Sequence, residues 1–181
     1  VRSSNNNTRI HGQQSVSRVH SARGEWASAL SSAEQSLAEV RDSGILHAEV
    51  GALCCIARAQ LGAGNAAAAL ATAREATSIA HERDALHEVE GLLLTSSALR
   101  ATGGPESADE IESVLAAASE GIDETGARAF QAELHLEAAE LADMRGDREV
   151  ARREYERAAV AFTERGATYL ARQVFERVSE S

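Results

Sequence analysis

The segment RGDREVARREYERAAVAFTERGA, which spans residues 145–167, decides the fold class of this chain. Its small and apolar residues recur at spacings of three and four, which places them on one stripe of a helix. The stripe consists of Ala151, Tyr155, Ala158, Ala159 and Phe162. The six arginines and five acidic residues of the segment occupy the other side. We therefore predict an amphipathic helix that Asp147 caps and Gly166 ends, with a solvated charged face rather than a binding or catalytic cluster.

The same pattern recurs along the chain at a nearly constant interval. One series of turn glycines has spacings of 40, 40 and 42 residues: Gly24, Gly64, Gly104 and Gly146. A second series lies about twenty residues further on and contains the same two-residue excess in its third copy: Gly44, Asp84, Gly126 and Gly166. Two interleaved series with one shared irregularity predict a tandem array of helix pairs. Pro105, the only proline, fits the first turn of a helix in that irregular copy.

The composition agrees with a folded, helical and acidic protein. Apolar residues make up 44% and charged residues 25% of the chain, and only six residues are aromatic, so the core must consist mainly of Ala, Leu and Val. The net charge of -10 argues against direct binding to nucleic acid. Every cationic residue is Arg, so no lysine can act as a nucleophile. The adjacent Cys54 and Cys55 are expected to be buried, reduced thiols of a cytoplasmic protein, and no segment predicts a signal peptide or a membrane span.

No constellation of residues predicts catalysis, a metal or a cofactor. His81 and His87 are six residues apart, which takes them off one helical face. The glycine-rich segments near residues 62 and 103 have no following Lys and are expected to be turns. Glu137 and Glu140 lie one turn apart on a helix and are expected to form a solvated face. We therefore predict that the chain is not an enzyme.

The repeats resemble the tetratricopeptide repeat (TPR). The fourth copy carries the resemblance best, through Gly146, Asp147, Ala151, Tyr155 and Ala158. The period of 40–42 residues is longer than the usual 34, and His135 and Ala142 stand where the family has aromatic residues early in the first helix. The longer form is similar to arrays attached to large bacterial signalling proteins, including ATP-dependent transcription regulators and nucleotide cyclases.

This resemblance implies an all-α fold, a right-handed superhelical array (α-solenoid) of about four antiparallel helix pairs with a C-terminal capping helix. We expect one TPR-like domain over residues 1–181, with repeats at about 8–43, 45–84, 85–125 and 127–165 and the capping helix at 167–179. Since the chain starts without Met, we also expect it to be a fragment of a larger protein.

The function implied by the resemblance is protein–protein interaction. The first helix of each pair lines the concave side of such an array, which predicts a partner-binding face with arginine towards one end and glutamate towards the other. The expected residues are Arg18, Cys54, Arg58, Leu94, Ala98, Glu133, Leu136 and Glu140. A peptide or helix with apolar anchors and charges of both signs would fit this face, as would an attached domain of the parent chain. Self-association as a homodimer and small-ligand sensing are the alternatives.

Overall fold

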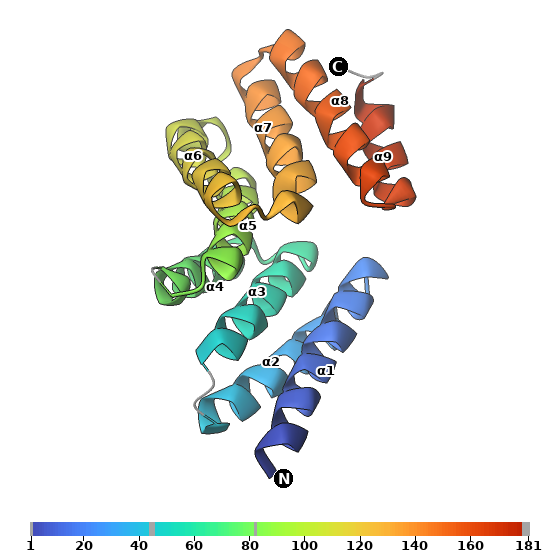
Figure 1. The fold of residues 1–181 in the computed structure, drawn as a ribbon. Coiled ribbons are helices and arrows are strands. Elements are labelled where there is room, and N and C mark those ends of the chain that lie inside the picture. Colours follow the sequence, from blue (N-terminus) through green and yellow to red (C-terminus); the bar gives the residue numbers. More distant parts are fainter. Residues whose placement is uncertain (1, 44–45, 82, 179–181) are drawn as a thin grey trace.

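The computed structural model describes residues 2–43, 46–81 and 83–178, and this part of the chain consists of helices joined by short turns (Figure 1). The predicted turn at Gly44, the start of the second repeat at Ile45 and the last residue of the predicted capping helix, Ser179, lie outside the described residues. The α-helices are α1 (Arg2–Ala22), α2 (Trp26–Ser43), α3 (Leu46–Gly62), α4 (Ala66–Ala80), α5 (Ala85–Gly103), α6 (Ala108–Thr125), α7 (Gln131–Arg145), α8 (Arg148–Glu164) and α9 (Thr168–Val178).

Each helix packs against the next one in the chain, which confirms the predicted all-α array of helix pairs. The first helices of the pairs (α1, α3, α5 and α7) also pack against one another in sequence. In Figure 1 the array bends, so that α4 and α6 lie on its outer side, away from α1 and α9. The first helices therefore form the concave face, as they do in the predicted arrangement.

The turn glycines adopt the backbone conformation that ends a helix. Gly64 and Gly146 have φ angles of 79° and 76°, in the left-handed region that a side chain rarely permits. The next amide reaches back to the last turn of the helix, from Asn65 to Gln60 at 2.8 Å and from Asp147 to Ala142 at 2.9 Å. These bonds satisfy carbonyl groups that would otherwise lack a partner. The side chain of Asp147 then caps α8 by accepting from the Val150 amide, as predicted.

The two extra residues of the third copy are absorbed in a short 3₁₀ turn, η1 (Gly104–Ser107), before α6 begins. Pro105 lies at the start of this 3₁₀ helix, as the prediction of a first-turn position requires. The turn preserves the phase of the following helix. Ile111, Leu115 and Ala118 therefore still face the core.

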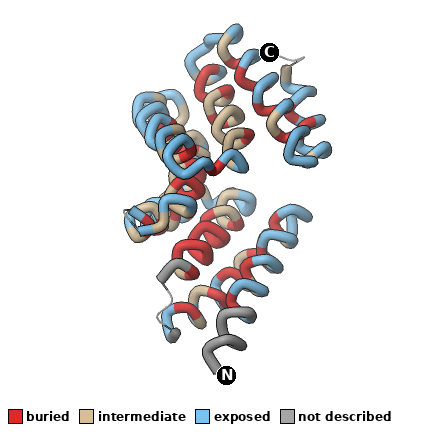
Figure 2. The backbone as a smooth tube through the Cα atoms, viewed as in Figure 1, coloured by how far each residue is buried: buried red, intermediate tan, exposed pale blue. Residues whose placement is uncertain are grey.

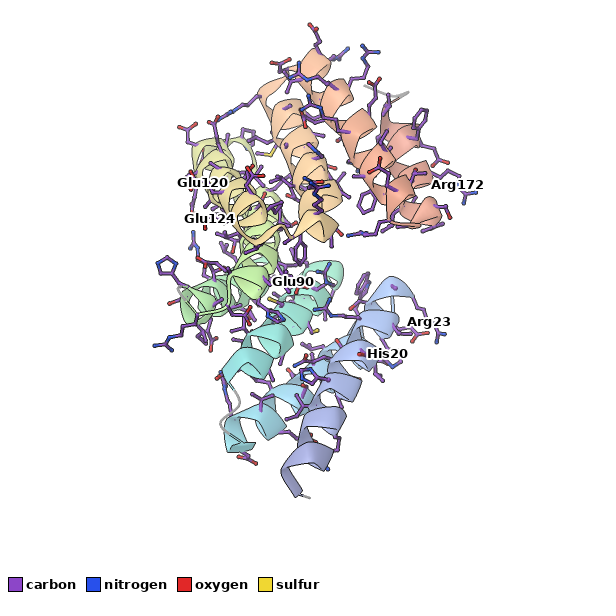
Figure 3. All side chains as sticks on the ribbon, in the orientation of Figure 1. His20, Arg23, Glu90, Glu120, Glu124 and Arg172 are labelled. Atoms are coloured by element: carbon purple, nitrogen blue, oxygen red, sulfur yellow. The ribbon has the colours of Figure 1, made fainter. Side chains whose placement is uncertain are left out.

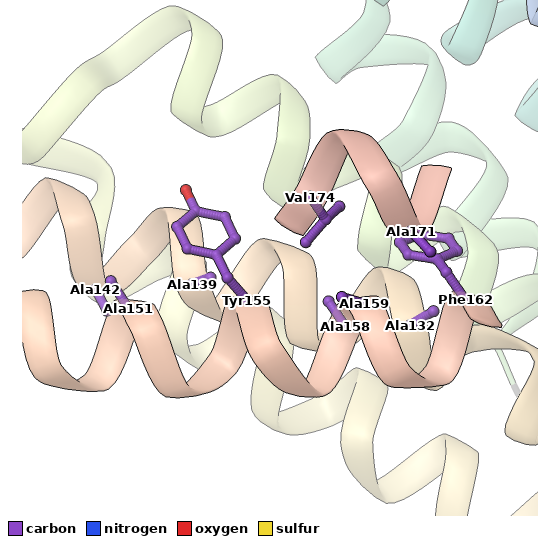
Figure 4. Close-up of a cluster of buried hydrophobic side chains, with 10 residues drawn as sticks. All are labelled: Ala132, Ala139, Ala142, Ala151, Tyr155, Ala158, Ala159, Phe162, Ala171 and Val174. Carbon is purple, nitrogen blue, oxygen red and sulfur yellow. The ribbon is translucent and has the colours of Figure 1, made fainter. Parts of the chain in front are cut away.

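Small side chains build the core, and the central first helices are the most buried. Figure 2 shows α3 buried along most of its length, since it lies among α1, α2, α4 and α5. At the C-terminal end Tyr155 and Phe162 supply the bulk that alanines cannot (Figure 4). Both residues come from the stripe of residues 145–167, and Val174 of α9 packs against the same cluster.

The charged side of that segment is exposed, as predicted, with one exception. Arg148, Arg152 and Arg157 face solvent on α8. Glu154 is buried instead, because it accepts from His135 of α7 at 2.8 Å and from Arg157 at 2.9 Å. The charged residues of this segment therefore mainly form a solvent-exposed helix face, and Glu154 links α8 to α7 through its contact with His135.

Candidate functional site

Two arginines from different repeats meet at one buried carboxylate on the concave face. Glu90 of α5 accepts from Arg18 of α1 at 3.1 Å and from Arg58 of α3 at 3.0 Å. The Glu90 side chain is 4% exposed, whereas the arginine side chains are 49% and 41% exposed. Figure 3 places Glu90 near the junction of α3 and α5. We call these three residues the Glu90 cluster.

The electrostatics of the Glu90 cluster keep all three groups charged. Burial raises the pKa of Glu90, but the charges of Arg18 and Arg58 outweigh it and hold that pKa below its ordinary value. Two cations and one anion leave a net charge of +1 at this point of an acidic chain. A guanidinium has five N–H donors, so each arginine can bond a further acceptor while it holds Glu90.

A second cluster continues along the concave face and links α5, α7 and α9. Glu137 accepts from Ser96 at 2.9 Å, from Ser97 at 2.6 Å and from Arg100 at 3.3 Å. Arg100 also pairs with Glu140 at 3.3 Å, and Arg177 of α9 donates to the same Glu140. We call Arg100, Glu137, Glu140 and Arg177 the Glu137 cluster, and its charges sum to zero.

The Glu137 cluster corrects the expectation of a solvated acidic face. Glu137 is 7% exposed and inaccessible to water on most sides. Its neighbour Glu140 has a side chain that is only 16% exposed. Both carboxylates serve to connect helices, because their partners lie on α5 and α9.

Three of the residues predicted to line the concave face lie in the core instead. Cys54, Leu94 and Ala98 are 0%, 5% and 0% exposed. The first two belong to the core cluster that includes alanines of α4, which packs against both α3 and α5. These three residues are therefore removed from the candidate surface.

The predicted burial of both cysteines is correct. Cys54 and Cys55 are free and buried, and desolvation raises the pKa of each thiol. They remain protonated in this environment, so neither is an activated nucleophile.

The other predicted residues are not gathered at one point. Arg18 and Arg58 both donate to Glu90. Glu133 instead forms a bidentate ion pair with Arg165, with N–O distances of 2.7 and 3.0 Å. Glu140 belongs to the Glu137 cluster. The two arginines lie on α1 and α3 and the two glutamates lie on α7, but each of these glutamates has an arginine partner.

Leu136 has the surroundings expected of an apolar anchor site. It is half-buried and lines a groove of about 460 Å³ between α7 and α9, together with Phe162, Leu170 and Val174. Glu140 and Arg177 lie at the same groove. The concave face therefore offers a positive point near its middle and an apolar groove towards its C-terminal end.

Glu90 is the functional residue that sequence reasoning missed. It lies six residues after the turn at Asp84, and the residues six after the turns at Gly44 and Gly126 are Val50 and Ala132. Both equivalents are buried in the core. An acid at a repeat position that is otherwise apolar is the signal that could have identified it.

A second groove lies on the outer side of the array and offers fewer groups that could bind a charged ligand. Residues of α6, α7 and α8 line a space of about 470 Å³ with an apolar floor that includes Leu134 and Leu141. The polar groups at its rim pair with each other, Arg145 with Glu112 at 2.8 Å and His135 with Glu154 at 2.8 Å. Arg145 is also paired with Asp109, so two acids outweigh the one arginine there, in contrast to the net positive Glu90 cluster.

The described residues form neither a metal centre nor a membrane span. Within residues 2–43, 46–81 and 83–178, no group of three or more His, Cys, Asp or Glu side chains could hold a metal ion. None of the described helices is both long and apolar enough to cross a bilayer.

Comparison with solved structures supports the fold. No family model and no curated protein matches the sequence. A crystal structure of nearly identical TPR-like repeats, described as those of a kinesin light chain from Podospora anserina, superposes with a TM-score of 0.61. The two chains are 16% identical, and the match covers 96% of this chain and 94% of that one. At this identity the likeness concerns the fold alone: the chain has a TPR-like helical array.

Proposed function

We propose that this TPR-like array is a protein–protein interaction module that binds an acidic peptide segment of its partner on the concave face. The Glu90 cluster is the observation that carries this proposal. Arg18 and Arg58 are held in place by one buried carboxylate and are still about half exposed. Positioned guanidinium groups favour carboxylate ligands, because both can make two parallel hydrogen bonds.

The groove beside Leu136 supplies the second element of recognition. An apolar side chain of the bound segment would enter the groove between α7 and α9, while its acidic group reaches the Glu90 cluster. A peptide that uses both points needs an apolar anchor and a negative charge. The net charge of -10 adds specificity, since the rest of the surface repels an acidic segment.

The biological setting belongs to the same proposal. The long repeat period resembles arrays attached to bacterial signalling and transcription-regulatory proteins, so we place the module in such a protein in the cytoplasm. The partner is then another protein, or an attached domain of the parent chain. Nucleic acid is a poor candidate, since the acidic chain lacks the cationic surface that phosphates require.

The test begins with a displayed random-peptide library that is selected on the immobilised protein. We expect the selected peptides to be enriched in Asp and Glu, and we measure their affinity by fluorescence anisotropy. Arg18→Gln should weaken binding about tenfold, which corresponds to about 1.4 kcal/mol. Arg58 remains to hold Glu90, so the fold should persist.

The matched control is Arg23→Gln, which changes an exposed arginine at the end of the same helix. This variant should bind the peptide as the wild type does. Selected peptides that bind the wild type and Arg18→Gln equally would contradict the proposal. So would a selection without acidic enrichment.

A further inference from the structure

The C-terminal end of the array exposes large apolar side chains. Phe175 lies nine residues after the turn at Gly166, and the residues nine after the turns at Gly44, Asp84 and Gly126 are the buried Leu53 and Leu93 and the half-buried His135. Leu53 packs with alanines of α4, and Leu93 packs with Ile111 and Leu115 of α6. In each of those pairs the second helix covers the leucine. Phe175 is 60% exposed, because no described helix covers this face of α9.

Val160 of α8 is a large apolar residue at a position where two other repeats carry smaller exposed side chains. It lies fourteen residues after Gly146, and the residues fourteen after Gly24 and Gly64 are the exposed Ala38 and Ser78. Val160 is 57% exposed. It lines a groove of about 460 Å³ between α8 and α9, together with Phe175, Ala171 and Arg172. This groove occupies the place where a further second helix would pack, so it continues the interface that joins all the other pairs.

The helix that fits this groove must run antiparallel to α9, since successive helices of the array alternate in direction. A twofold axis perpendicular to α9 places the α9 helix of a second copy in that orientation, and twofold dimers are the commonest oligomers. If the helices cross at residue 174, the two Phe175 side chains lie roughly 3 Å apart along the helix direction, at 1.5 Å rise per residue. They would cover each other at the axis.

Under that twofold symmetry, each charged residue on this face of α9 lies opposite a residue of the other sign in the second copy. Arg172 and Glu176 are exposed and one turn apart, so an antiparallel copy crossing at residue 174 sets Arg172 against the second copy's Glu176, twice. Figure 3 shows Arg172 on α9, at the right-hand edge of the molecule in that view. Its guanidinium lies 5.8 Å from the ring centre of Tyr169 on the same helix. The charged residues therefore flank the apolar centre in a self-complementary order.

We propose that the exposed face of α9 formed by Arg172, Phe175 and Glu176, with the adjoining groove at Val160, is the interface of a twofold homodimer in which α9 of each copy fills the second-helix position of the other. Glu176 also borders the groove beside Leu136, whereas Val160 and Phe175 do not. The Glu90 cluster has no residue in this surface, so the proposal does not depend on peptide binding there.

Analytical ultracentrifugation of residues 1–181, up to the solubility limit, tests the proposal. We expect a reversible dimer for the wild type. Phe175→Glu and Val160→Ser should each shift the equilibrium to monomer, with helical content unchanged by circular dichroism. The matched control is Val19→Glu, which places the same charge on an exposed valine at the other end of the array and should leave the dimer intact.

Charge reversal tests the antiparallel pairing itself. Arg172→Glu alone and Glu176→Arg alone should each weaken the dimer, because each sets like charges opposite one another. The double variant should restore the dimer, since it exchanges the members of both pairs. A wild type that stays monomeric at all concentrations would overturn the proposal and leave the groove to a helix of another protein. A dimer that survives Phe175→Glu, or a double variant that is not restored, would overturn it equally.

Discussion

Glu90 is a carboxylate at a position where equivalent repeats carry an apolar side chain. Burying a charge in a protein is costly unless the charge is paired. Removing one partner of a buried ion pair therefore destabilises the fold by more than the intact pair stabilises it. Arg18 and Arg58 meet this requirement from two other repeats. The cluster therefore contributes both to the structure and to the proposed peptide site.

The pH dependence of the free energy of unfolding should show the contribution of the ionised Glu90 carboxylate. Burial opposes its ionisation, but the two arginines hold its pKa below the ordinary value. A lowered folded-state pKa stabilises the fold above the unfolded value of about 4.3, and this contribution is lost as the pH falls through the folded-state pKa. Urea unfolding of the wild type and Glu90→Gln should therefore differ most near neutral pH, and the difference should shrink below about pH 4. A difference that stays constant across this range would contradict the assignment.

Individual residues also mark the limit of sequence reasoning on this chain. The stripe of Tyr155, Ala158 and Phe162 was predictable, because helical spacing alone fixes which residues share a face. Ion-pair partners were not, since Arg18 and Glu90 are 72 residues apart and meet only through the curvature of the array. The predicted exposure of Cys54 and Leu94 failed for a related reason. A small rotation of a helix decides whether such a position faces solvent or the neighbouring helix.

The helices depend on close approach at residues without a side chain. A Cβ on Gly91 of α5 would lie 2.6 Å from Oγ1 and 3.3 Å from the backbone nitrogen of Thr77 on α4. A Cβ on Gly62 would meet the ring of Trp26 at 2.3 Å. Successive helices therefore pack through glycine and alanine, which accounts for a core with few aromatic residues.

Gly91→Ala and Gly12→Ala form a matched pair that tests this packing. Both glycines lie inside helices, and alanine favours a helix by about 1 kcal/mol. Gly12 has no atom within 4 Å of an added Cβ, so its variant should gain about 0.5–1 kcal/mol. Gly91→Ala should instead lose about 1–3 kcal/mol through overpacking against Thr77. Equal gains in urea unfolding would show that α4 and α5 do not need this close approach.

Helix ends were the most predictable elements. Glycines with positive φ end α3 and α7 where the first series of turns places them, because a left-handed residue is needed at such turns. The 3₁₀ turn at Gly104–Ser107 was predictable only as an irregularity of two residues. Its conformation depends on how α5 and α6 must pack, which the spacing does not specify.

The whole molecule presents two surfaces, which adjoin at α9. The concave face carries the Glu90 cluster, and the end of the array carries the groove between α8 and α9. A twofold dimer through the second surface would hold two concave faces at once. A partner with two acidic segments would then bind more tightly than either face alone allows, because the second contact becomes intramolecular.

The most direct measurement is a nuclear magnetic resonance titration of the labelled wild type with a selected acidic peptide. We expect the largest shifts on the side-chain Nε–H groups of Arg18 and Arg58 and on the backbone amides of α1, α3 and α5. Smaller shifts should follow along α7 around Leu136. Shifts that cluster on the outer helices α4 and α6, with both arginine signals unchanged, would contradict the concave face as the binding site.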